Sequence, residues 1–184
     1  MDIEKLYELG ENYFYGENAK QSYEEALKYF LEGARLNDAQ SNYMVGYMYE
    51  NGLGTETNYE LAIKYYQTSV NLGLVDAMVS LGYMYENGLG VERCYEEALK
   101  YYLQASNQND PEGTYLVGYM YEAGLGVETN YEEAYKYYLK ASKLKDYKAC
   151  EKLGYFYEKG LGVEKNLEES NKWYNLSKEY NTEE

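Results

Sequence analysis

The residues most suggestive of a reactive site are glycine pairs in short turns, of which Gly88-Leu89-Gly90 is typical. Such turns can cradle phosphate groups when a strand leads into them and a lysine follows in register. Here no strand is expected before the turn, and Glu92 stands two residues after the second glycine. The turns therefore predict a backbone reversal and no nucleotide site.

Carboxylates and thiols offer no better catalytic arrangement. Glu96 and Glu97 are adjacent, so on a helix their side chains point in different directions and do not converge on one bond. Cys94 and Cys150 have no histidine to activate them, because the chain contains none. Calcium loops need oxygen ligands at alternate positions together with a glycine, and no segment has them. We therefore predict no catalytic residue, no metal site, no cofactor and no enzyme activity.

The net charge of the chain limits the classes of molecule that it can bind. The 184 residues include 32 acidic and 17 basic side chains, a formal net charge of −15. Such a surface repels phosphate backbones and anionic lipid headgroups, so nucleic acids and membranes are poor partners and basic proteins or peptides are better ones. No apolar run approaches the ~20 residues of a membrane span, and no secretory signal is visible. With its two cysteines at unrelated repeat positions, the chain is expected to be cytoplasmic.

A repeated sequence motif predicts the structural units that would position any functional site. Five glycines stand 36 residues apart: Gly10, Gly46, Gly82, Gly118 and Gly154. The repeats span residues 3–38, 39–74, 75–110, 111–146 and 147–182, and a fixed period of this size is the signature of a solenoid. Polar residues replace apolar ones on the outer stripes of the first and last repeats. We therefore expect one complete solenoid domain over residues 1–184.

Each repeat predicts two helices and hence an all-α fold. In the second repeat, Val45 and Tyr49 have helical spacing, Gly52 stands where a left-handed C-cap is needed, and a second helical run begins after Asn58. The equivalents of Asn58 are Ser22, Asn130 and Asn166, each followed by a glutamate at capping-box spacing: Glu25, Glu133 and Glu169. Cys94 breaks this series.

Small residues and aromatic residues each recur at equivalent positions of the repeats, here called columns, and these columns predict how the helices pack. The repeated glycine of each first helix and an alanine in most second helices would let helices approach closely. Aromatic residues form two further columns, such as Tyr65 and Tyr66 in the second repeat. Tyrosine buries a large area but needs a partner for its hydroxyl, so much of the tyrosine content is expected to be structural.

The pattern L-G-x-x-Y-x-x-G-x-G-V, followed by A-x-x-[WY]-Y, resembles the Sel-one-like repeat family, relatives of tetratricopeptide repeats. The residues that carry the match recur at 36-residue offsets and are, in the third repeat, Leu81, Gly82, Tyr85, Gly88, Gly90, Val91, Ala98, Tyr101 and Tyr102. The resemblance implies a right-handed α/α superhelix whose first helices line a concave groove. The first repeat departs from the pattern, with Glu17 and Asn18 where the others have leucine and glycine.

By position in the family, the groove would expose a set of tyrosines and glutamates. They are Tyr43, Tyr47, Glu50, Tyr83, Glu86, Tyr115, Tyr119, Glu122, Tyr155 and Glu158. Tyrosine rings can hold cations, and carboxylates attract them over distance, so this surface would suit a protein or peptide with basic segments. The alternative is that these glutamates are solvated helix formers and these tyrosines reflect only a tyrosine-rich composition.

The resemblance also implies what the protein does, because members of the family usually act as adaptors or scaffolds. The leading hypothesis is a non-enzymatic scaffold that holds a peptide or protein segment in its concave groove. The alternative is a regulatory or adaptor subunit, in a ubiquitin-ligase or kinase pathway, that binds through its convex face or ends. A more distant alternative is a hydrolase, as described for some secreted, cysteine-paired members of the family.

Overall fold

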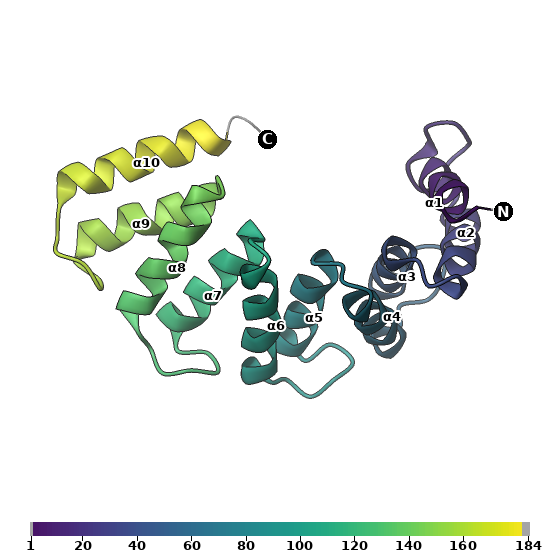
Figure 1. Cartoon of the computed structure of the whole chain (residues 1–184), viewed down its shortest axis with the longest axis horizontal. Coiled ribbons are helices and arrows are strands. Elements are labelled where there is room, and N and C mark those ends of the chain that lie inside the picture. Colours follow the sequence, from purple (N-terminus) through teal and green to yellow (C-terminus); the bar gives the residue numbers. More distant parts are fainter. Residues whose placement is uncertain (1, 182–184) are drawn as a thin grey trace. The chain divides into compact units, whose positions relative to one another are not determined.

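A computed structural model describes residues 2–181, which form ten α-helices and contain no strand (Figure 1). The helices are α1 (Ile3–Glu11), α2 (Tyr23–Arg35), α3 (Ala39–Asn51), α4 (Tyr59–Asn71), α5 (Asp76–Asn87), α6 (Tyr95–Asn107), α7 (Pro111–Ala123), α8 (Tyr131–Lys143), α9 (Tyr147–Lys159) and α10 (Leu167–Asn181), and a π-helical turn, η1 (Asn12–Gly16), follows α1. The predicted all-α repeat fold is confirmed.

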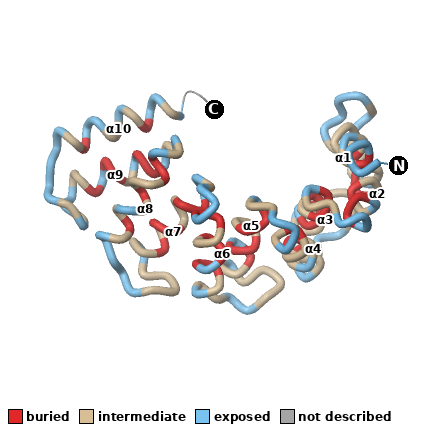
Figure 2. Tube along the Cα trace, viewed as in Figure 1, coloured by how far each residue is buried: buried red, intermediate tan, exposed pale blue. Residues whose placement is uncertain are grey.

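The chain forms two compact units, Met1–Arg93 and Cys94–Glu184. In the first unit, each helix from α1 to α5 packs on the next one in the chain. The second unit repeats this order from α6 to α10. Buried residues follow the helix-to-helix contacts inside each unit, as expected when every repeat buries its apolar face against its neighbours (Figure 2).

The predicted caps of the second helices form, and aspartates cap several first helices as well. Asn58 Oδ1 accepts a hydrogen bond from the backbone of Leu61 at 2.9 Å, and Asp38 does the same for Ser41 at 2.8 Å. Equivalent caps are made by Ser22, Asn130, Asn166, Asp110 and Asp146. Cys94 makes no side-chain cap, so α6 begins without one.

The reciprocal half of the capping box does not form, and this part of the prediction is wrong. The backbone N–H at the capping position donates instead to a carbonyl oxygen of the preceding segment, which closes the hairpin. Asn58, which has Leu61 and no glutamate three residues on, makes this bond to Tyr49 at 2.8 Å. The same bond joins Ser22 to Tyr13, Asn130 to Tyr121 and Asn166 to Tyr157. The glutamates Glu25, Glu133 and Glu169 pair instead with the lysine three residues later.

Glycine is required where each first helix meets the second helix of its repeat. A Cβ on Gly118 would lie 2.8 Å from two ring atoms of Tyr138, and one on Gly46 would lie 2.7 Å from the Tyr66 ring. Both tyrosines are fully buried, so neither ring can swing into solvent. The packing role predicted for the repeated glycine is confirmed at these two positions.

The first repeat folds differently at its turn, where the sequence departs from the pattern. The π-helical turn η1 takes the place of the last α-helical turn of the first helix in the other repeats, and Gly16, at the position of Gly52, ends it with φ +78°. Tyr15 in this turn is 57% exposed, whereas Phe14 packs its ring against Tyr23 and Phe30. The turn thus presents an aromatic side chain that the other repeats lack.

The two cysteines are free, and they differ in accessibility. Cys150 is fully buried, and burial raises the pKa of its thiol to about 11, whereas Cys94 is partly exposed. We expect a thiol reagent to modify one cysteine quickly in the folded protein, because only a thiolate in contact with solvent reacts. Counting thiols after unfolding without reductant should give two. Two fast thiols in the folded state, or none after unfolding, would contradict this assignment.

Candidate binding surface

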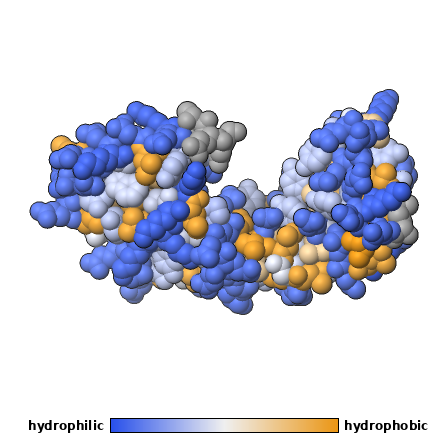
Figure 3. Space-filling view, turned by 45° about the horizontal axis from the view of Figure 1, so that its top comes forward, coloured by the Kyte–Doolittle hydropathy of each residue, from blue (hydrophilic) through white to orange (hydrophobic). Residues whose placement is uncertain are grey.

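The tyrosines expected along the first helices differ in exposure. Tyr47 on α3, Tyr83 on α5 and Tyr155 on α9 are exposed by 38%, 50% and 40%. Tyr119 on α7 is half-buried. Large exposed aromatic rings at one repeat position are consistent with a contact surface. In the view of Figure 3, hydrophilic side chains cover most of the visible surface, with apolar ones in smaller groups.

Tyr43 and Tyr115, one turn earlier, lie deeper. Burial raises the pKa of Tyr115 to about 12 and raises that of Tyr43 in the same direction. Each packs its ring against the buried tyrosine of the next helix, with ring centroids 5.6 Å apart and an interplanar angle of 40° in both pairs, Tyr43–Tyr66 and Tyr115–Tyr138. These two tyrosines therefore form the floor of the surface.

The glutamates have a structural partner that the sequence analysis missed. Tyr66 donates its hydroxyl hydrogen to Glu50 at 2.6 Å, and Tyr174 donates to Glu158 at 3.2 Å. Tyr138 donates in the same way to Glu122. The signal was present in the sequence, because the partners are always 16 residues apart. The bonds from Tyr66 and Tyr138 satisfy buried hydroxyls, and all three bonds fix a carboxylate at the rim of the surface. Glu86, the remaining glutamate, is half-buried on α5.

Lys152 on α9 is the second feature that the repeat columns did not indicate as part of the site. Its Nζ atom lies 2.8 and 3.0 Å from the two carboxylate oxygens of Glu122 and 6.0 Å from the centre of the Tyr119 ring. The tyrosine–glutamate surface of the second unit therefore already holds one ammonium group. The arrangement combines an ion pair with a cation–π contact.

Each unit has a hollow on this surface. In the second unit it measures about 480 Å³ and is lined by Tyr115, Glu122, Lys148, Glu151, Lys152, Tyr155 and Tyr174. In the first unit it measures about 260 Å³ and is lined only by uncharged residues: Phe14, Tyr15, Tyr43, Met44 and Tyr47. The exposed turn η1 supplies two of these rings, a contribution that the sequence analysis did not expect.

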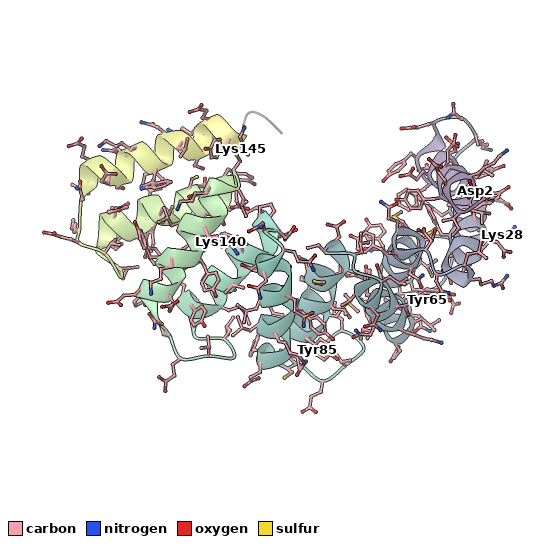
Figure 4. The ribbon with its side chains drawn as sticks, viewed as in Figure 1. Asp2, Lys28, Tyr65, Tyr85, Lys140 and Lys145 are labelled. Carbon is pink, nitrogen blue, oxygen red and sulfur yellow. The ribbon has the colours of Figure 1, made fainter. Side chains whose placement is uncertain are left out.

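Side chains of the second helices make contacts that join neighbouring helices. Tyr65 on α4, labelled in Figure 4, stacks on Tyr49 with ring centroids 5.8 Å apart. Lys140 on α8 donates to the backbone oxygen of Ser106 and lies 3.2 Å from its hydroxyl. Both side chains tie one helix to another, so they contribute to the scaffold.

Two further findings concern the described part of the chain, residues 2–181. No group of three or more histidine, cysteine, aspartate or glutamate side chains is arranged to hold a metal ion. None of the helices has the length and apolar character needed to cross a bilayer.

The chain is similar to known repeat proteins. A family model described as the Sel1 repeat matches residues 6–38, 39–74, 75–110, 111–146 and 148–179. Among solved structures, c5321, a protective antigen of uropathogenic Escherichia coli with an SLR fold, is 32% identical with a TM-score of 0.92. That match covers 97% of this chain but only 38% of the antigen, so this chain is much shorter than its relative.

Two other structures extend the similarity. A Sel1 repeat protein from Oxalobacter formigenes is 26% identical with a TM-score of 0.91, covering 97% of this chain and 73% of that one. Cysteine-rich protein B of Helicobacter pylori is 27% identical with a TM-score of 0.55, covering 70% of this chain and 96% of that one. No curated protein sequence matches the chain significantly.

Proposed function

Because the chain belongs to the Sel1 repeat family, whose members generally mediate protein–protein interaction, we propose that it is a non-enzymatic adaptor for basic protein segments. The ligand is a peptide or protein segment rich in lysine or arginine. It lies along the tyrosine–glutamate surface of the first helices, the surface that the family resemblance assigns to the groove. A cytoplasmic location is part of the proposal, since Cys94 and Cys150 are both free thiols.

The observation that carries this proposal is the exposure of Tyr47, Tyr83 and Tyr155 at one repeat position, next to carboxylates held in place from below. An exposed ring contributes about 0.5–2 kcal/mol for each cation it contacts. The net charge of −15 adds long-range attraction that speeds association with a basic segment. The tyrosine rings would contribute binding energy through contact with the ligand, and the carboxylates would speed its association.

The alternative surface also has a specific feature. A hollow of about 490 Å³ lies over α1 and α2 and is lined by Leu6, Glu25, Lys28, Tyr29, Glu32 and Leu36. Leu36 is 47% exposed there. An adaptor that binds through this surface, and not through the first-helix tyrosines, is the second candidate function.

A peptide array separates the two. We expect wild-type protein to select peptides rich in lysine and arginine and to avoid those rich in aspartate and glutamate. The Tyr47→Ala/Tyr83→Ala double variant should bind a selected peptide about tenfold more weakly, the loss of about 1.4 kcal/mol. Affinity for wild type should also fall as salt passes about 0.1 M, where charges farther apart than about 10 Å are screened.

Matched controls make the result specific. Tyr131→Ala removes a ring that is 40% exposed but lies on a second helix, so affinity should stay at the wild-type value. Leu36→Glu tests the alternative surface, and circular dichroism checks that each variant keeps its helices. Selection of acidic peptides, or full affinity in the double variant with loss in Leu36→Glu, would replace the proposal with the alternative surface.

A further inference from the structure

Lys152 shows what the tyrosine–glutamate surface can hold. Its ammonium group sits between both carboxylate oxygens of Glu122 and faces the ring of Tyr119. Glu122 is kept in place from the other side by the hydroxyl of Tyr138. The lysine comes from α9, the first helix of the following repeat, and it fills the site of α7 with the chain's own cation.

The same site exists two repeats earlier, on α3 of the first unit. Tyr43, Tyr47 and Glu50 correspond to Tyr115, Tyr119 and Glu122. The supporting geometry is also the same, because the ring pairs Tyr43–Tyr66 and Tyr115–Tyr138 have equal centroid distances and equal interplanar angles. In both units the buried tyrosine of the next helix donates its hydroxyl hydrogen to the glutamate.

The two sites differ in the residue that follows. At the position of Lys152, the first unit has Ser80 on α5. Ser80 is short and interacts with the hydroxyls of Tyr43 and Tyr66. Among residues 2–181, no lysine or arginine forms an ion pair with Glu50, whose described hydrogen bond is the one from Tyr66. The α3 site has the partners of an ammonium group without the ammonium group itself.

The space beside this site suits the aliphatic part of a lysine. The hollow of about 260 Å³ is lined by the rings of Phe14, Tyr15, Tyr43 and Tyr47 and by Met44. Its uncharged wall would pack on methylene groups. Glu50 does not line this hollow; it lies one turn after Tyr47 on α3, where it would pair with the charged end.

We infer that α3 holds a lysine side chain of the bound segment at Tyr43, Tyr47 and Glu50, in the place that Lys152 fills in the second unit. This subsite rests on the proposed function, since it requires a basic segment as ligand. In the wild-type protein the first unit is therefore open to a lysine of the ligand, and the α7 site of the second unit is closed by Lys152.

The test places a lysine in the open site. Ser80→Lys should fill the α3 site and weaken binding of a lysine-rich peptide about tenfold. Ser80→Met adds comparable length and also removes the hydroxyl, but it brings no charge, so it should weaken binding less. Glu50→Gln keeps an acceptor for Tyr66 while removing the charge, and it should lose affinity for the lysine peptide but not for the same peptide with norleucine in place of lysine.

The reverse substitution keeps the inference testable even if a Ser80 variant fails to fold. Lys152→Ser should open the α7 site and raise the affinity for the lysine-rich peptide several-fold. Lys165→Ser removes the same charge from an exposed position in the turn before α10 and should leave the affinity nearly unchanged.

The results of these experiments distinguish a failure of the lysine subsite from a failure of the proposed function. If wild-type protein does not bind basic peptides, the proposed function fails, and the subsite fails with it. If wild type binds them but Ser80→Lys, Glu50→Gln and Lys152→Ser all bind as wild type does, the proposed function stands and the lysine subsite is wrong. Equal losses for Ser80→Lys and Ser80→Met would also overturn it, because charge would then play no part.

Discussion

Above about pH 10 the protein is expected to unfold cooperatively, because its buried tyrosines must ionise. Burial and then the hydrogen bond to Glu122 raise the pKa of Tyr138 well above the ordinary tyrosine value. Burial and the bond to Glu50 act in the same way on Tyr66, with a minor opposing contribution from Ser80. A raised pKa in the folded state means that stability is complete below the ordinary pKa of about 10 and is lost as the pH rises above it.

The size of the effect follows from the number of such groups. Each pH unit above about 10 costs about 1.4 kcal/mol for every tyrosine that stays protonated in the fold. Tyr66 and Tyr138 are both fully buried, so together they remove about 5 kcal/mol by about pH 12. That equals the lower end of the ~5–15 kcal/mol by which most domains are stable. Tyr115 and Tyr135, whose pKa values burial raises to about 12, add to the loss.

Absorbance and circular dichroism, followed together, check this expectation. Tyrosinate absorbance from the buried set should appear over the same pH range in which helicity disappears. In the Tyr66→Phe/Tyr138→Phe variant, the free energy of unfolding should fall less steeply with pH, whereas Tyr83→Phe, at an exposed ring, should leave the slope unchanged. Complete ionisation of all tyrosines with the helices intact would show that the rings are accessible and the packing is wrong.

The Gly118→Leu substitution is expected to destabilise the second unit by about 2 kcal/mol or more. A Cβ alone would lie 2.8 Å from the Tyr138 ring and 3.3 Å from the carbonyl oxygen of Ala134. Overpacking of this kind costs about 1–3 kcal/mol. Replacing a helical glycine returns about 0.8 kcal/mol of helix propensity, which is smaller. The clash dominates because Tyr138 is fully buried and its hydroxyl is bound to Glu122.

Chemical denaturation followed by circular dichroism measures this loss. Ala123→Leu introduces the same side chain at an exposed position of the same helix, so its stability should stay within about 0.5 kcal/mol of wild type. If Gly118→Leu and Ala123→Leu unfold at the same denaturant concentration, position 118 is not at the helix contact.

The sequence predicted the local structure best where one residue decides the outcome alone. Asn58 caps α4 and Gly52 is left-handed at φ +66°, as the spacing indicated. The reciprocal bond of the capping box does not form at Asn130, because the backbone N–H that it needs is already bonded to Tyr121, a contact between helices that residue spacing alone does not show. The π-helical turn η1 was also beyond prediction, because the first repeat leaves the period at that point.

The residues of the candidate surface were predicted from their positions in the repeat. The contacts that some of them make were not, because those contacts join different columns or differ from one repeat to another. The structure places Tyr47, Tyr83 and Tyr155 at exposed positions. The bond from Tyr138 to Glu122 was missed because it joins two columns that were considered separately. Lys152 was not singled out from the sequence, because its role depends on a distance between two helices that no periodicity supplies.

The bonds that close each hairpin have a consequence for how the gene can change. The backbone bond from Asn58 to Tyr49 and the side-chain bond from Tyr66 to Glu50 both lie inside one 36-residue period, as set by Gly46 and Gly82. An in-frame duplication or deletion of one period rejoins equivalent positions wherever its ends fall, so these bonds are reproduced without a compensating mutation. Unequal recombination could therefore change the number of tyrosine–glutamate sites in a single step, and selection would act on that number as well as on single codons.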